Sequence, residues 1–117
     1  MRMAALALLF AILAFGENRV DVAGKWNITI RMPGHVTMEQ WNIQQKGTTV
    51  TGVAKGEHGE MPVAGDIEGQ LLRVRVKDGA KEYKVRATVD GNSMDGSITF
   101  GVGDEHIWFA RRPPAGK

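Results

Sequence analysis

Short segments in which apolar and polar residues alternate make up the sequence from residue 24 to residue 112, and turns that contain glycine separate them. A period of two places every second side chain on the same face of a β-strand. No segment carries the 3.6-residue period of a helix over a competing length. The pattern predicts strands at 24–32, 38–46, 48–55, 61–68, 70–77, 81–89, 94–101 and 105–112.

The turns also predict which residues face each other, because the length of a hairpin turn fixes the register of its strands. We place two-residue turns at Lys46-Gly47, Gly69-Gln70, Asp78-Gly79 and Gly91-Asn92, and a looser turn at 56–59. Each turn then brings apolar or small residues together on one face of the sheet. The predicted pairs are Ile43 with Val50, Trp41 with Gly52, Ala54 with Met61, Gly52 with Val63, Ile67 with Leu72, Gly65 with Val74, Val74 with Tyr83, Leu72 with Val85, Val89 with Met94, Val85 with Ile98 and Tyr83 with Phe100.

About eight antiparallel strands with one apolar face form either a sandwich or a closed barrel. All the predicted connections are short, whereas Greek-key sandwiches need long crossovers. We therefore expect an all-β, antiparallel up-and-down meander barrel in a single domain, since the chain has 117 residues. The predicted division is an N-terminal segment at 1–16, a linker at 17–23, the barrel at 24–112 and a flexible tail at 113–117.

The N-terminal segment, 1–16, has one arginine, about a dozen apolar residues and then small residues, which is typical of a secretory signal. Its apolar run is too short to cross a bilayer of roughly 30 Å comfortably. The sequence thus predicts an exported protein, periplasmic or secreted. If residues 1–16 are retained, they act as a hydrophobic anchor and the protein is attached to a membrane.

The start of the first strand and the end of the last one form a second pattern. Gly24-Lys25-Trp26 opens the first strand, and Arg111 ends the eighth. With the eight-strand meander, these residues resemble the lipocalin and avidin group of calycin barrels. The resemblance implies that Trp26 plugs the closed end of the barrel and packs against Arg111 as a structural latch. A guanidinium over an indole is also favourable as a cation–π contact. The alternative is that Trp26 is a core aromatic residue of another small β fold.

The resemblance does not extend to a ligand. The chain has neither the long loop and C-terminal helix of typical lipocalins nor the biotin-contacting residues of avidin. In the predicted parity of the last strand, Ile107, Phe109 and Arg111 point inward and Trp108 points outward. An exposed tryptophan indicates a contact surface. Two paired basic strands add Arg73 and Lys84 as candidate contacts with a protein partner or an anionic headgroup. The alternative for these strands is a solvated face that blocks aggregation.

The predicted interior is apolar and also contains small residues. Catalysis needs groups that ionise or accept protons, so we expect no catalytic residues and no enzyme activity. Inward glycines leave space that either a neighbour such as Trp41 or a small apolar ligand would fill. The predicted ligand cavity is lined by Trp41, Gly52, Val63, Gly65, Val74, Tyr83, Ile98 and Phe100.

Alternate turns of a meander lie at the same end of the barrel, and those near 33–37, 56–60, 78–80 and 102–106 share the end opposite Trp26. They bring polar residues to an open rim: His35, His58, Asp78 and His106. Imidazoles and carboxylates suit a divalent metal, but their spacing does not preorganise a site. We therefore predict a polar rim and no metal, with a ligand gate or docking rim that titrates through histidine as the alternative.

Composition narrows the class of function. Lys and Arg number 15 against 13 Asp and Glu, and they are scattered, which argues against a nucleic-acid partner. The absence of cysteine excludes disulfides, thiolate metal sites and a cysteine nucleophile. The sequence predicts an exported module that binds a small apolar ligand without a cofactor. The alternatives are a structural or accessory subunit that docks on a protein or membrane complex, and a secreted protease inhibitor.

Overall fold

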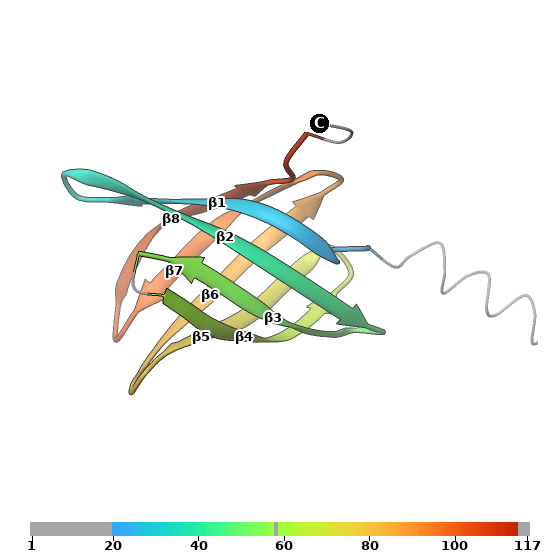
Figure 1. Ribbon diagram of the computed structural model, residues 1–117, viewed down its shortest axis with the longest axis horizontal. Coiled ribbons are helices and arrows are strands. Elements are labelled where there is room, and N and C mark those ends of the chain that lie inside the picture. The colour runs from blue at the N-terminus through green and yellow to red at the C-terminus, as the bar shows by residue number, and fades with distance from the viewer. Residues whose placement is uncertain (1–19, 58, 115–117) are drawn as a thin grey trace, which may run out of the picture.

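The computed structural model describes residues 20–57 and 59–114, and they form one closed barrel of eight antiparallel strands (Figure 1). Strands adjacent in sequence are adjacent in the sheet, and β1 pairs with β8 to close it. The predicted up-and-down meander barrel is therefore confirmed. The strands are β1 (Gly24–Met32), β2 (His35–Lys46), β3 (Thr49–Gly56), β4 (Gly59–Glu68), β5 (Leu71–Asp78), β6 (Lys81–Asp90), β7 (Ser93–Phe100) and β8 (Asp104–Arg111).

The predicted signal or anchor, 1–16, lies outside the described residues. Within residues 20–57 and 59–114, no helix has the length and apolar character needed to cross a membrane.

Three of the predicted hairpin registers are confirmed. Ala54 faces Met61 across β3 and β4, and Gly65 faces Val74 across β4 and β5. Tyr83 faces Phe100 across β6 and β7. Each of these pairs lies in the interior. The residues that the turns predict to face inward therefore do face inward in these strands.

The other two hairpins turn one residue later than predicted. Their turns are 47–48 and 79–80, so Trp41 faces Ala54, and Val76 rather than Val74 faces Tyr83. Gly47 and Gly79 have φ values of 65° and 66°, and no described non-glycine residue has a positive φ. A two-residue turn with a positive φ only at its first position is type II′, which puts the glycine first. The late turn shifts the register by two residues, so the inward faces stay as predicted.

The inward glycines do not create the predicted space. A Cβ at Gly65 would overlap the carbonyl oxygen of Arg73, and one at Gly96 would overlap that of Arg86. Gly52 meets the backbone of β2 in the same way. These glycines lie where the strand approaches its neighbour's backbone closely, as at a tight bend in a barrel. Their missing side chains allow curvature rather than leaving room for a ligand.

The predicted parity of β8 is wrong. Trp108 is fully buried and faces Gly96, while Ile107 points outward and is 56% exposed. Phe109 also lies on the outer face, where it is half-buried. Alternation could not decide between the two faces, because four consecutive residues, 107–110, are all apolar. Packing decides it: Trp108 lies opposite Gly96, and its indole packs against Trp41 in the core, with ring centroids 5.3 Å apart. Trp108 is therefore part of the core and not a contact surface.

The chain before β1 closes one end of the barrel. Val22 is fully buried beside Trp26, and the Trp26 indole donates a hydrogen bond to the carbonyl oxygen of Val22 at 2.9 Å. The side chain of Gln45 accepts a hydrogen bond from the Val22 amide and donates one to the Val20 carbonyl. The described part of the predicted linker, 20–23, is therefore a packed plug.

The latch arginine is Arg112, not Arg111. The guanidinium of Arg112 lies 4.3 Å from the centre of the Trp26 ring and donates to the carbonyl oxygens of Asp21 and Ala23, both at 2.7 Å. Arg111 points outward, over Phe109 at 5.3 Å, and forms an exposed ion pair with Asp95 at 3.7 Å. The correction follows from the parity of β8: even-numbered residues face inward, so the inward arginine is the next one along the chain.

Replacing Arg112 and replacing Arg111 should change the free energy of unfolding by different amounts. We expect Arg112→Ala to lower the free energy of unfolding by about 1–2 kcal/mol, because it removes a cation–π contact and two hydrogen bonds to the plug. Arg111→Ala should cost less than about 1 kcal/mol, since its ion pair is exposed. Urea denaturation measures both values.

Hydrogen exchange separates the latch from a general effect on stability. The indole N–H of Trp26 should exchange faster in Arg112→Ala and at the wild-type rate in Arg111→Ala, because of the two arginines only Arg112 contacts the segment that accepts its hydrogen bond. Equal exchange in the two variants would contradict the assignment of the latch.

Candidate binding pocket at the barrel mouth

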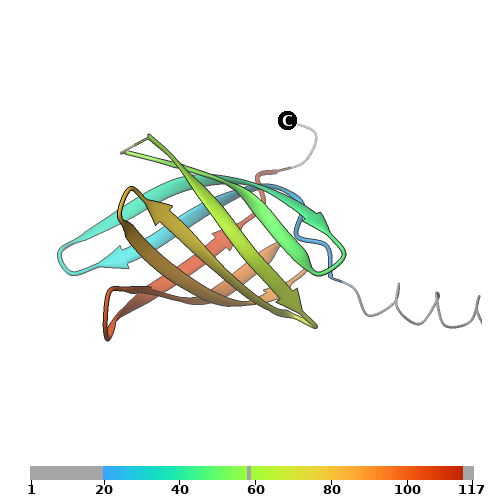
Figure 2. The same cartoon turned by 90° about the horizontal axis from the view of Figure 1, so that it is seen from below.

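The end of the barrel opposite Trp26 carries four hairpin turns. Figure 2 shows the β1–β2, β3–β4, β5–β6 and β7–β8 turns together at this end. The sequence predicted this gathering from the meander alone. It predicted nothing about how deep the opening is, because depth depends on how the side chains below it pack.

A pocket of about 230 Å³ lies in this mouth. Its apolar wall is made by Ile30, Met32, Met61, Val76, Ile98 and Phe100. Its polar groups are His35, Thr37, Glu39, Glu57, Asp78 and Tyr83. An apolar cavity of roughly 150 Å³ is enough to bind benzene, so the space suits a molecule built around a single ring.

The predicted cavity residues separate into two groups. Tyr83, Ile98 and Phe100 line the pocket as expected. The others lie deeper or at bends: Trp41, Val63 and Val74 are buried in the core, and Gly52 and Gly65 are the close-approach glycines. Side chains fill the lower barrel, so the open space is confined to the mouth.

Two of the predicted rim residues, His35 and Asp78, line the pocket. The imidazole of His106 packs against Phe100, with ring centroids 5.4 Å apart, and its Nε2 lies 4.0 Å from a carboxylate oxygen of Asp104. His58 lies outside the described residues. Among those that the structure describes, no group of three or more His, Asp or Glu side chains is arranged to hold a metal ion.

The sequence interpretation missed the polar wall that β2 supplies. The strand begins at His35, three residues before the predicted start, so Thr37 and Glu39 join His35 on the inner face. Parity with Trp41 would have placed Glu39 inside the barrel, because the two residues are two positions apart in one strand. The prediction of an apolar interior is therefore wrong at the mouth, where Glu39 faces inward.

Glu39 is held by its neighbours. Its Oε1 accepts a hydrogen bond from the indole N–H of Trp41 at 2.9 Å. A Cβ at Gly56 would lie 3.2 Å from Cγ of Glu39, so the glycine leaves room for this side chain between β2 and β3. The half-buried carboxylate thus has a defined position at the edge of the pocket. Of the three buried indoles, that of Trp108 differs, since its Nε1 has no hydrogen-bond partner among the described residues.

Tyr83 connects the aromatic and acidic sides of the pocket. Its ring meets Phe100 edge-on at 4.7 Å, and its hydroxyl donates to Oδ2 of Asp78 at 3.2 Å. Burial of the phenol raises the pKa of Tyr83, and the hydrogen bond to Asp78 together with the negative charges of Asp78 and Glu39 raises it further. The mouth therefore favours the neutral phenol.

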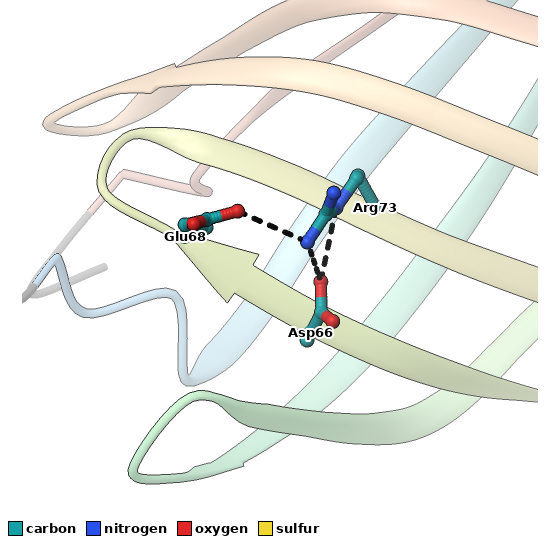
Figure 3. A network of polar contacts seen from close by, with 3 residues as sticks. All are labelled: Asp66, Glu68 and Arg73. Atoms are coloured by element: carbon teal, nitrogen blue, oxygen red, sulfur yellow. Dashed lines mark hydrogen bonds and ion pairs between the residues drawn. The ribbon is translucent and has the colours of Figure 1, made fainter.

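The basic outer face on β5 and β6 differs in register from the prediction. Arg73 faces Arg86, and Lys84 faces Arg75. Arg73 is nevertheless paired, because it lies 3.1 Å from Asp66 and 3.2 Å from Glu68 on β4 (Figure 3). These groups are exposed, so their ion pairs add little to stability.

No protein-family model matches this sequence, and none of the curated proteins does.

The raised pKa of Tyr83 can be measured directly, because the chain contains a single tyrosine. Tyrosinate absorbance should report a pKa above the ordinary value of about 10. Asp78→Asn should move it towards that value, while burial keeps it somewhat raised. Asp104→Asn, a rim carboxylate outside the pocket wall, serves as the control and should leave it unchanged.

The same shift links stability to pH. A folded-state pKa above the unfolded value contributes stability that is present below about pH 10 and is lost as pH rises through the folded pKa. A Tyr83 pKa at or below about 10 in the folded chain would contradict the contacts described for the mouth.

Proposed function

We propose that this barrel is a non-catalytic binding module that holds a small apolar molecule in the mouth pocket. The single observation that carries the proposal is the pocket itself, which places six apolar side chains around about 230 Å³ at the open end of a barrel that is otherwise filled. Mouths of β-barrels are common places for small-molecule sites. Export from the cytoplasm belongs to the same proposal and rests on residues 1–16 of the sequence.

Two features support binding at this place. The opposite end is closed by Trp26 and the plug, so access is from the mouth. The wall is formed by strands from around the closed barrel, which gives a largely preformed site. A preformed apolar site reduces the ordering that binding would otherwise require.

The test uses ethylbenzene, a neutral molecule with one ring, added to the full chain and followed by NMR shifts. We expect shifts at Val76, Ile98 and Phe100. Met61→Trp fills the pocket with a larger side chain and should lower the affinity by more than about tenfold. Val53→Trp makes a similar enlargement on the outer face of β3 and should leave the affinity unchanged.

Thermal unfolding gives an independent check, because a ligand that binds only the folded chain raises Tm with its concentration. The proposal fails if ethylbenzene perturbs no pocket residue. It also fails if Met61→Trp, shown to be folded, binds the probe as tightly as the wild-type chain does.

A second candidate function is docking on another protein through the outer faces of β2 and β8, on either side of β1. An outer apolar patch lies there, formed by Val36, Met38, Ile107 and Phe109. Met38 is 69% exposed and Ile107 is 56% exposed. Val36 and Ile107 both face Arg31 of β1, so the apolar residues of β2 and β8 lie on either side of that arginine. Exposed apolar patches mark interaction surfaces, and this one replaces Trp108 as the candidate contact.

Site-specific photo-crosslinking tests this alternative in the cells that make the chain. A photoreactive residue at position 38 should give one dominant adduct of defined mass, and Ile107→Glu should abolish that adduct because it puts a charge into the apolar contact. The matched control carries the photoreactive residue at position 51, which is exposed on the outer face of β3. No adduct from position 38, or the same adducts from both positions, would contradict docking through the outer apolar patch.

A further inference from the structure

The charges in the mouth pocket indicate the chemistry of its ligand. Among the described residues that line it, the acidic groups are Glu39, Glu57 and Asp78, and six apolar side chains line the same pocket. A negatively charged concave site raises the local concentration of cations and lowers that of anions. The pocket therefore combines a requirement for an apolar body with a preference for positive charge.

We propose that the ligand is a small apolar amine, whose protonated nitrogen is held by the carboxylates of Glu39 and Asp78. Its apolar part then lies against Ile98 and Phe100. The inference rests on the proposed binding function and names the chemical class of its ligand.

The two carboxylates have free capacity to accept hydrogen bonds. Glu39 uses Oε1 for the Trp41 indole, and Asp78 uses Oδ2 for the Tyr83 hydroxyl. The other oxygen of each accepts no side-chain hydrogen bond from the described residues, and neither carboxylate is in an ion pair with a described residue. An ammonium group brings donors and no acceptor, which matches two fixed carboxylates with unused lone pairs.

The carboxylates of Glu39 and Asp78 both act on the hydroxyl of Tyr83. The negative charges of Asp78 and Glu39 both contribute to the raised pKa of its phenol. A field that opposes a phenolate favours a cation at the same position, because the sign of the interaction reverses with the charge. The ring of Phe100, in edge contact with Tyr83, adds an aromatic surface close to the acidic groups.

The experiment compares three probes with the same ring and similar size: 2-phenylethylamine, 2-phenylethanol and 3-phenylpropanoate. At neutral pH they carry a positive charge, no charge and a negative charge. NMR titration of the full chain gives the three affinities. We expect the amine to bind at least about tenfold more tightly than the alcohol, as one charge-assisted hydrogen bond allows, and the acid to bind most weakly.

The double variant Glu39→Gln and Asp78→Asn should remove the preference for the amine while keeping the affinity for the alcohol. Glu105→Gln removes a charge from the exposed rim outside the pocket wall and is the matched control. Salt gives a test without mutation: between about 0.01 M and 1 M, the Debye length falls from about 30 Å to about 3 Å. Binding of the amine should weaken over that range, whereas binding of the alcohol should not.

The outcomes separate the two proposals. Equal affinities for the three probes, or a preference for the acid, would overturn the inference about the amine and leave the apolar binding function in place. Failure of all three probes and of ethylbenzene to bind would overturn both. Retention of the preference for the amine in a folded double variant would show that Glu39 and Asp78 do not hold the nitrogen.

Discussion

Pairing of β1 with β8 is the constraint on which the rest of the structure depends. It joins the first strand to the last, from Asn27 opposite Arg111 to Arg31 opposite Ile107. Closure leaves no exposed sheet edge, so the backbone groups that would template aggregation are paired inside the barrel. It also fixes where the chain enters and leaves, which brings residues 21–23 and Arg112 together over Trp26.

Glycine has two different roles in this closure. Gly47, Gly69, Gly79 and Gly91 have positive φ values of 61–66° and occupy the first position of a two-residue turn. Gly52, Gly65 and Gly96 lie within strands, where another strand's backbone comes too close for a Cβ. The first group sets the register, and the second lets the sheet curve tightly enough to close. Three buried tryptophans pack the lower barrel, and the pocket lies above them in the mouth.

The two ends of the barrel are therefore chemically different. One end is sealed by Val22, Trp26 and a guanidinium, with backbone carbonyls as its acceptors. The other combines an apolar wall with carboxylates that belong to three different hairpins. The surface outside adds apolar residues on β2 and β8 and a basic face on β5 and β6. A recognition role at the mouth and a docking role on the outer face would use separate surfaces of one small domain.

The sequence by itself determined the class of fold, the number of strands, the gathering of four turns at one end and the inward face of most strands. Those properties depend on local alternation and short turns, which the chain specifies residue by residue. The inward position of Glu39 was also available from its parity with Trp41. Only the tertiary structure decided the parity of β8, because residues 107–110 are apolar on both faces and the packing of Trp108 against Trp41 selects the inward face. It likewise decided that Arg112 is the latch and that the pocket lies in the mouth, because both depend on packing between segments far apart in the sequence.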